Sequence, residues 1–248
     1  MNALPAIELR GLTKRYGARN ALDGLTLAID RACFCALLGP NGAGKSTLFQ
    51  LLTGLFAADA GQARIAGHDI RTQPVAALAA LGVVFQQPAL DLDLSVERNL
   101  RFHAALHGLL RRTADERIDQ GCAALGLDKE RARMARELSG GNRRKVELVR
   151  ALLHRPAVLL MDEASVGLDP ASRRDLLAAL RVDIGARGTT VLWATHLVEE
   201  ALPADRVLVL HQGRLLADGT PGEVTRALGG PSLESAFIQS TQVRKEAA

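Results

Sequence analysis

Gly39-Pro40-Asn41-Gly42-Ala43-Gly44-Lys45-Ser46-Thr47 is the stretch from which the fold of the chain is predicted. Its spacing, a glycine, any four residues, then Gly-Lys-Ser, matches the phosphate-loop pattern. The apolar run at 33–38 has the length of a buried strand, and residues 48–53 have helical composition. We therefore predict a strand, a glycine-rich loop and a helix that together cradle the phosphates of a nucleotide.

The residue types in this loop each suit one task in phosphate binding. Glycines at 39, 42 and 44 leave room for phosphate oxygens to reach the backbone amides at the positive end of the helix. Lys45 would contact the β- and γ-phosphates, the hydroxyl of Ser46 would bind Mg²⁺, and Thr47 would add a donor. An incidental glycine-rich turn is the alternative, and the flanking strand and helix argue against it.

Length and composition favour a single domain. The 248 residues are 48% hydrophobic and contain no linker-like segment, which predicts one large α/β domain. The net charge of +4 comes from interspersed charges, so charge alone does not indicate nucleic acid. The longest apolar stretch, 75–85, is far shorter than the roughly 18 residues that span a bilayer. Residues 1–10 lack a signal-peptide core, and the three cysteines suit a reducing compartment, so we expect a cytoplasmic protein.

Two stretches before the loop alternate apolar and polar residues, at 7–10 and 25–30. This pattern predicts two half-buried strands joined by a loop over 13–20. Tyr16, the only tyrosine, lies in that loop, where its ring could stack on a nucleotide base. An ordinary surface tyrosine remains the alternative.

A polar residue ends the next predicted strand. Residues 63–66 predict a short strand, 75–81 a helix and 83–85 a buried strand, after which Gln86 follows at once. Parallel sheets place ligands at the carboxyl ends of their strands, so Gln86 could coordinate Mg²⁺ or the attacking water. Taken alone, a loop glutamine facing solvent explains it equally well.

Residues 95–153 show helical patterns without strands, which predicts an inserted helical subdomain. Ser95 is expected to cap a helix over 96–107, and Thr113 with Glu116 to form a capping box for a helix that ends near residue 126. His103 and His107 are one helical turn apart, but a metal site would need a third ligand that the sequence does not indicate. Packed or exposed histidines are therefore favoured.

A second glycine-containing motif, Leu-Ser-Gly-Gly-Asn at 138–142, opens a helix that is expected to continue through residue 153. Ser139, Gly140 and Gly141 at a helix start predict a second anion-binding end, separate from the phosphate loop. A plain glycine-rich helix cap would also explain the motif by itself.

Acids and a histidine follow two later strands. The apolar run 158–161 ends in Asp162 and Glu163, which predicts a magnesium-holding carboxylate and a carboxylate that polarises water. Asp169 before a proline predicts the start of a helix to about residue 186. The strand at 189–194 ends at Thr195-His196, so the imidazole could bond a γ-phosphate oxygen or be structural. A hairpin over 207–217 and a helix after residue 231 complete the prediction.

Taken in this order, the motifs resemble the ATP-binding cassette of ABC transporters, and the resemblance covers essentially the whole chain. It implies an α/β P-loop NTPase core with a mixed sheet, an antiparallel β-subdomain and an inserted helical subdomain. The implied boundaries are a core at 1–88 and 155–230, a helical subdomain at 89–154 and a tail at 231–248.

The resemblance also implies a role for each motif residue. It assigns adenine stacking to Tyr16, the Walker A loop to Gly39, Pro40, Asn41, Gly42, Ala43, Gly44, Lys45, Ser46 and Thr47, the Q-loop position to Gln86, the signature to Ser139, Gly140 and Gly141, Walker B to Asp162, the catalytic carboxylate to Glu163, the D-loop acid to Asp169 and the switch histidine to His196. Ser46, Gln86 and Asp162 would hold Mg²⁺. ATP would be closed between the Walker A loop of one subunit and the signature of another.

The implied assembly is a homodimer or pseudo-symmetric cassette dimer on an integral membrane subunit, at the inner face of the cell membrane, with no nucleic acid. Three departures from the family pattern are Asn142 for glutamine, Ala164 for proline and Ser165-Val166 for a commoner Thr-x pair. Asparagine keeps an amide, and the charged positions are intact, so we expect a competent site.

The runs at 85–88, 92–94 and 99–100 are similar to export-type cassettes that pair with separate membrane subunits. The expected function is an ATPase that powers transport, with export as the direction. A soluble cassette ATPase acting on DNA or ribosomes is the alternative, although no zinc-binding cysteines or second cassette are seen. A small-molecule kinase is a third possibility, but it leaves 139–141 unexplained.

Overall fold

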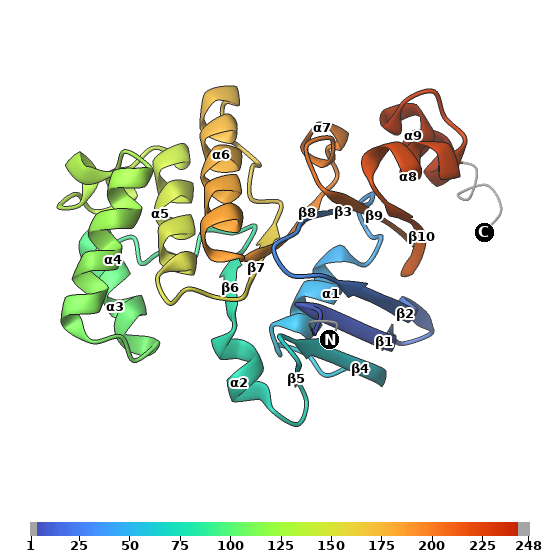
Figure 1. Ribbon diagram of the computed structural model, residues 1–248, viewed down its shortest axis with the longest axis horizontal. Helices are drawn as coiled ribbons and strands as arrows, with labels where there is room; N and C mark the ends of the chain where they lie inside the picture. Colours follow the sequence, from blue (N-terminus) through green and yellow to red (C-terminus); the bar gives the residue numbers. More distant parts are fainter. Residues whose placement is uncertain (1–3, 243–248) are drawn as a thin grey trace.

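The protein, represented by a computed structural model that describes residues 4–242, is built from two sheets and a lateral block of helices (Figure 1). The strands are β1 (Ile7–Tyr16), β2 (Arg19–Ile29), β3 (Phe34–Leu38), β4 (Ala60–Ile65), β5 (His68–Asp69), β6 (Leu81–Val84), β7 (Val158–Asp162), β8 (Thr190–Thr195), β9 (Arg206–His211) and β10 (Arg214–Gly219). The helices are α1 (Lys45–Leu52), α2 (Pro74–Ala79), α3 (Val96–Leu106), α4 (Arg111–Ala124), α5 (Gly140–Leu152), α6 (Pro170–Arg187), α7 (Val198–Ala201), α8 (Pro221–Leu228) and α9 (Leu233–Gln242), with short 3-10 turns η1 (Asp128–Glu130) and η2 (Ala135–Glu137).

The larger sheet has the strand order β10-β9-β3-β8-β7-β6, in which only β10 runs antiparallel to its neighbour. Its strands β3, β7 and β8 are buried at every position, as their uninterrupted apolar runs predict. The parallel register pairs Leu38 with Thr195 and Asp162 with Ala194. The segments that follow β3, β6, β7 and β8 therefore emerge at one edge of the sheet.

The smaller sheet is antiparallel, with the order β2-β1-β4-β5. Its first two strands are longer than predicted, because β1 continues to Tyr16 and β2 begins at Arg19, so most of the predicted loop over 13–20 is strand. Shifts of register interrupt the pairing of the two strands, and Gly11 and Gly24 near them have positive φ angles of 59° and 64°. These irregularities break the alternation of apolar and polar residues on which the sequence prediction relied.

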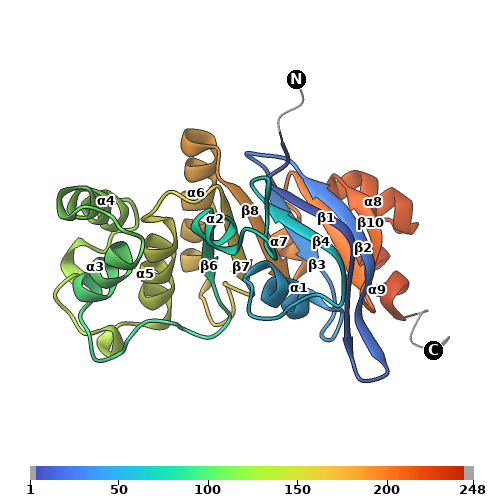
Figure 2. The ribbon, with the colours of Figure 1, turned by 90° about the horizontal axis from the view of Figure 1, so that it is seen from below.

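Two hydrophobic cores hold the layers together. One fills the space between the two sheets and includes Leu48 and Leu52 of α1. The other covers the opposite face of the larger sheet, where Trp193 packs with Leu176 and Leu180 of α6, and it continues into the helical block. Figures 1 and 2 show α3, α4 and α5 together on the side of the molecule away from the antiparallel sheet. The predicted α/β core with a mixed sheet, an antiparallel sheet and inserted helices is confirmed.

The capping predicted from the sequence is present at the start of α3 but not at the start of α4. Ser95 caps α3 by accepting from Arg98 N at 3.3 Å, as predicted. The predicted capping box at Thr113 is wrong, because α4 already begins at Arg111 with no side-chain cap. A complete box instead starts α8, where Thr220 and Glu223 bond each other's backbone amides.

Within residues 4–242, no helix has both the length and the hydropathy of a membrane span.

Candidate active site

The loop at 39–47 connects the buried strand β3 to α1, as predicted. Gly44 has φ of 109°, and a Cβ there would lie 2.5 Å from the carbonyl oxygen of Ala21, so only glycine fits. The first hydrogen bond of α1 runs from Leu48 N to Gly44 O, and no side chain caps the helix. The amides at 45–47 therefore have no acceptor within the helix, which leaves them available to a bound anion.

Lys45 is held inside the curve of the loop. Its ammonium donates to Gly39 O at 2.6 Å and to Pro40 O at 3.3 Å, and it lies 3.7 Å from Glu163 Oε1. Burial lowers the pKa of Lys45, while the carboxylates of Glu163 and Asp162 act in the opposite direction. The ammonium of Lys45 is thus a positioned cation beside the carboxylates of Glu163 and Asp162.

Asp162 and Ser46 form a neighbouring oxygen pair. Asp162 ends β7 and is only 9% exposed, and its pKa is raised by burial and by the charge of Glu163. Lys45 and a hydrogen bond from the Ser46 hydroxyl partly offset that rise. A carboxylate beside a hydroxyl is a donor set that suits Mg²⁺.

Glu163 is the centre of the site. Its carboxylate accepts from Gln86 Nε2 at 3.1 Å and lies 3.2 Å from His196 Nδ1. A carboxylate only accepts, so this contact places the hydrogen of the imidazole on Nδ1. Lys45, at the start of α1, lies near the same carboxylate, so residues that follow β3, β6 and β8 meet at Glu163. The sequence placed Gln86 and His196 at this edge of the sheet but did not predict that they meet at Glu163.

The predicted signature residues, at 139–141, lie away from the cluster around Glu163. Ser139 caps α5 by accepting from Asn142 N at 3.2 Å, and Gly141 packs so closely that an added Cβ would lie 2.8 Å from Ser172 Oγ. Ser172 in turn donates to Asp169 at 2.6 Å, which lowers the pKa of that carboxyl. Figures 1 and 2 show β6 and β7 between α5 and α1, so the structure does not bring 139–141 to the phosphate loop of the same chain.

Tyr16 is exposed and lies at the end of the β1–β2 hairpin, with its ring edge-on to Phe56 at 6.4 Å. Its cross-strand partner is Arg19, whose guanidinium donates to Gly42 O at 3.1 Å. The hairpin end therefore touches the phosphate loop. Arg19 was not predicted as a site residue, because a single arginine in a polar stretch carries no pattern.

A family model described as ABC transporter matches residues 22–166. The chain belongs to the ABC transporter family. It is 38% identical over 239 residues to the daunorubicin resistance ATP-binding protein DrrA3 of Streptomyces coeruleorubidus, covering 96% of this chain and 75% of that protein. It is 36% identical to the probable multidrug ABC transporter ATP-binding protein YbhF of Escherichia coli, covering 94% of this chain and 41% of that protein.

Solved structures agree with this assignment. The structure described as the ATP binding subunit of an ABC transporter has a TM-score of 0.86 and 29% identity, covering 94% of this chain and 98% of that one. The structure of cbiO1 from Clostridium perfringens, part of the cbiONQ transporter complex, has a TM-score of 0.82 and 28% identity, covering 97% and 95%. The chain is an ATP-binding ATPase subunit of an ABC transporter, and these relatives give no support to the alternative of a DNA- or ribosome-acting ATPase.

The cassette contains a buried ion pair that the sequence analysis missed. Arg144 and Glu147, on the packing face of α5, are bonded at 2.8 Å and are 6% and 1% exposed. Arg144 donates to the carbonyls of Phe85 and Gln86 at 2.6 and 3.0 Å, and Glu147 accepts from Ala89 N at 2.6 Å. The pair therefore ties the helix that begins with the signature to the segment that carries Gln86.

A second missed network supports the cassette's loops after β7 and β8. The buried carboxylate of Glu200 accepts from Thr195 Oγ1 at 2.5 Å and from the Ser165 hydroxyl. Ser165, one of the departures from the family pattern, thereby holds the segment after Glu163 against the segment that leads to His196. The sequence signal was weak, because Glu200 follows another glutamate and reads as a solvated acid.

Proposed function

We propose that the strand-end cluster of this cassette binds ATP with Mg²⁺ and that Glu163 is the catalytic base. The convergence of Lys45, Gln86 and His196 on the Glu163 carboxylate carries this proposal. A carboxylate that contacts several neighbouring side chains is held in one orientation, which suits it to accept a proton from an attacking water. Lys45 would pair with the β- and γ-phosphates.

The magnesium ligands in this proposal are Ser46, Asp162 and the amide oxygen of Gln86. The Gln86 nitrogen donates to Glu163, which leaves its oxygen for the ion, and Ser46 already bonds Asp162. When bound, Mg²⁺ neutralises charge that develops on the phosphate oxygens. Tyr16, at the hairpin end that touches the loop, would stack on the adenine.

We further propose that the cassette works as a head-to-tail dimer. Ser139, Gly140 and Gly141 lie at an exposed or half-exposed helix start, beside Asp169 and away from their own phosphate loop. In a symmetric dimer each such helix start would meet the nucleotide on the partner cassette. The helical subdomain at 89–154 would then move relative to the core at 1–88 and 155–230 when ATP binds, with 231–248 as a tail.

The membrane subunit would dock on the helical subdomain. Phe102, Leu106 and Leu110 are 62%, 68% and 78% exposed near the end of α3, and apolar side chains exposed together mark interaction surfaces. We propose export as the direction, since relatives of this chain are named for multidrug transport, daunorubicin resistance and Nod factor export.

Substitution of the base tests the proposal. Glu163→Gln removes the proton acceptor but keeps the side-chain size, so ATP should still bind while turnover falls by about 100-fold or more. The variant should accumulate as nucleotide-bound dimers, measured by light scattering with ATP and Mg²⁺. Glu199→Gln, at a carboxylate that is 86% exposed, is the matched control. Normal turnover by Glu163→Gln would disprove the assignment of the base.

A further inference from the structure

Three of the six histidines of the chain meet outside the ATP site. His103 lies in the last turn of α3, His107 follows that helix, and His154 follows α5. The rings of His107 and His154 are stacked at 3.7 Å with an angle of 9°, and that of His103 is 4.7 Å from His107. One ring nitrogen from each of the three lies within 4.8 Å of the others. The fold thus supplies the third histidine that the i, i+4 pair lacked in the sequence.

A hydrogen bond to the backbone determines which ring nitrogen of His154 carries the hydrogen. His154 Nε2 is 2.8 Å from the carbonyl oxygen of Leu81 at the start of β6. A carbonyl only accepts, so Nε2 carries the hydrogen and Nδ1 keeps its lone pair. Nδ1 of His154 and Nε2 of His103 are both buried without a hydrogen-bond partner. A histidine that donates one nitrogen to a carbonyl and offers the other is the usual arrangement of a metal ligand.

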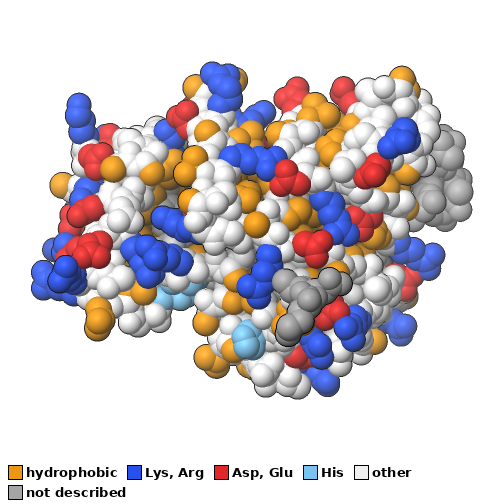
Figure 3. All heavy atoms as spheres, viewed as in Figure 1, with side chains coloured by type: hydrophobic (Ala, Val, Ile, Leu, Met, Phe, Trp, Pro, Cys, Tyr) orange, Lys and Arg blue, Asp and Glu red, His pale blue; other side chains and the backbone are white. Residues whose placement is uncertain are grey.

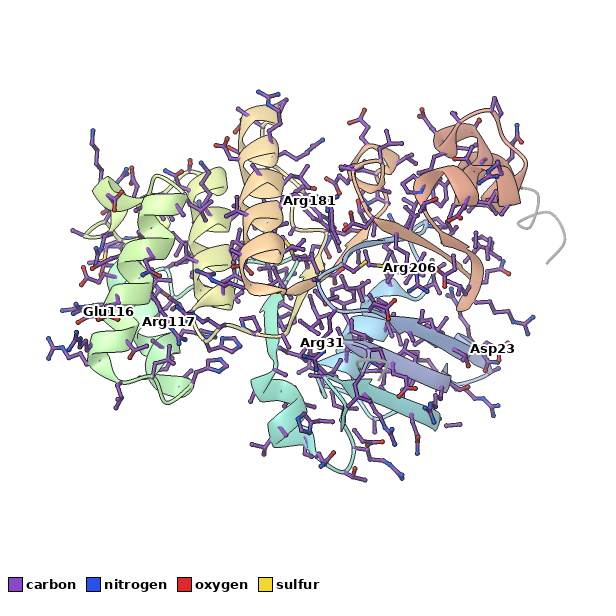
Figure 4. All side chains as sticks on the ribbon, viewed as in Figure 1. Asp23, Arg31, Glu116, Arg117, Arg181 and Arg206 are labelled. Carbon is purple, nitrogen blue, oxygen red and sulfur yellow. The ribbon has the colours of Figure 1, made fainter. Side chains whose placement is uncertain are left out.

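The surroundings keep the rings neutral. Burial is the largest cause that lowers the pKa of His103 to about 3 and that of His154 to about 4, and it also lowers that of His107. Arg150 adds positive charge near His103, and Arg117 adds it near His154. Arg150 donates to the carbonyl oxygen of Ala89, and Arg117, which Figure 4 labels beside α4, donates to that of Leu153. No carboxylate belongs to the described cluster, so its donor set suits an ion that prefers imidazole and excludes Mg²⁺ and Ca²⁺.

We propose that His103, His107 and His154 bind one divalent transition-metal ion of the zinc class, with the fourth coordination position open. Two imidazole nitrogens on one tetrahedral zinc lie about 3.3 Å apart, and the ion lies near the plane of each ring. The rings must therefore move closer, and the stacked pair must splay apart, when the ion binds. All three side chains are half-buried, so the site can be reached from solvent, and Figure 3 shows histidine at the molecular surface beside the helical block.

The position of this site gives it a structural effect. His103 lies in α3 and His107 directly follows it, His154 follows α5, and the Leu81 carbonyl belongs to β6. A bound ion would therefore cross-link two helices of the helical block next to the edge strand of the core. An ion that binds the three histidines only in the folded state stabilises the folded state.

The first test uses the full-length untagged chain, freed of metal with a chelator and kept without nucleotide. Calorimetric titration with ZnCl₂ should show one zinc per chain, and His107→Ala and His154→Ala should each lower its affinity by about tenfold or more. His68→Ala, at a half-buried histidine of β5, is the matched control and should leave the affinity unchanged. His107→Gln guards against a folding defect, since it keeps a side chain of similar size.

The second readout is the coordination itself. X-ray absorption of the zinc-loaded protein should show imidazole nitrogens at about 2.0–2.1 Å, and zinc should raise the melting temperature of the wild-type chain but not of His107→Ala. Equal zinc affinity in the wild type and His107→Ala would overturn the proposal. So would zinc binding that is lost in His196→Ala, because that result would place the ion at the ATP site.

Discussion

Glu163, the proposed base, has a backbone conformation that non-glycine residues rarely adopt, with φ of 46°. Such strain persists only where neighbouring structure holds it, and here the Glu163 amide donates to Ala194 O at 2.9 Å on the adjacent strand. The left-handed turn redirects the chain directly after Asp162. As a result, two consecutive acids serve different partners, Ser46 in one case and Gln86 with His196 in the other.

Lys45→Ala should remove most of the ATP affinity of the cassette. Hydrogen bonds to charged groups contribute about 1.5–3 kcal/mol each, so the dissociation constant should rise by roughly ten- to a hundredfold. Calorimetry with ATP and Mg²⁺ measures the change, and Lys129→Ala, at an exposed lysine of η1, is the control. An affinity equal to that of the wild type would show that the loop does not hold the phosphates.

Asp162→Asn should raise the stability of the nucleotide-free cassette at neutral pH. Burial raises the folded-state pKa of Asp162, so ionisation of this group opposes folding above its unfolded pKa of about 3.9. This opposition is complete above the folded pKa and disappears as the pH falls through it. The variant should therefore melt at a higher temperature than the wild type at pH 7, and the difference should vanish near pH 4.

Scanning calorimetry across that pH range measures the effect, with Asp175→Asn as an exposed control. A wild-type protein that is the more stable of the two at pH 7 would mean that Lys45 and Ser46 outweigh the burial of Asp162. The same substitution should weaken magnesium-dependent ATP binding, because it removes a proposed ligand of the ion.

At this scale, the sequence was most informative where residue type and spacing together specify one chemistry. Lys45 was predicted from the phosphate loop, and Gln86, Glu163 and His196 from strand ends. The structure places the four side chains together, and their roles stay predictions. Contacts that depend only on three-dimensional proximity could not be predicted. Arg19 reaches Gly42 across the hairpin, and His154 reaches His107 from a point 47 positions later in the chain.

Among the elements, the buried strands were the easiest to predict, because β3, β7 and β8 are continuous apolar runs. The bulged strands β1 and β2 were underestimated, since glycines with positive φ interrupt their alternation. The two Thr-x-x-Glu stretches show a different limit. Both have the spacing of a capping box, but only the one at Thr220 lies at a helix start.

The buried pair on α5 should be essential to the stability of its surroundings. Glu147→Ala would leave Arg144 charged and without its carboxylate, and would orphan the Ala89 amide. Breaking one partner of a buried ion pair lowers the free energy of unfolding by about 3–5 kcal/mol. Urea denaturation measures this, with Glu137→Ala, at a carboxylate that is 49% exposed, as the control. A loss as small as that of the control would show that water replaces the missing partner.

For the whole molecule, the signature and the phosphate loop of one chain are separated. The proposed dimer must therefore combine the phosphate loop of one chain with the signature of the other at each ATP site. Lys45→Ala should inactivate the phosphate loop, and Ser139→Arg should block the exposed signature without touching the core. In a head-to-tail dimer made of one copy of each, one site carries both defects and the other carries neither.

Mixing the two inactive variants should therefore restore ATPase activity that neither has alone. Phosphate release is measured at several mixing ratios, and the activity should be highest near equal amounts. A mixture of Lys45→Ala with Lys45→Ala,Ser139→Arg is the control and should stay inactive. Absence of any restored activity in the first mixture, with dimers present by light scattering, would contradict the shared site.

Helix α5 begins with the signature, and Arg144 on the side of this helix bonds the backbone carbonyls around Gln86. In the proposed dimer, a tilt of this helix start would therefore also shift Gln86, which faces the nucleotide of its own cassette. Each cassette of a pair would in this way register at its own pocket whether its neighbour's pocket is filled. Communication between the two ATP sites of the dimer would then run through this one helix.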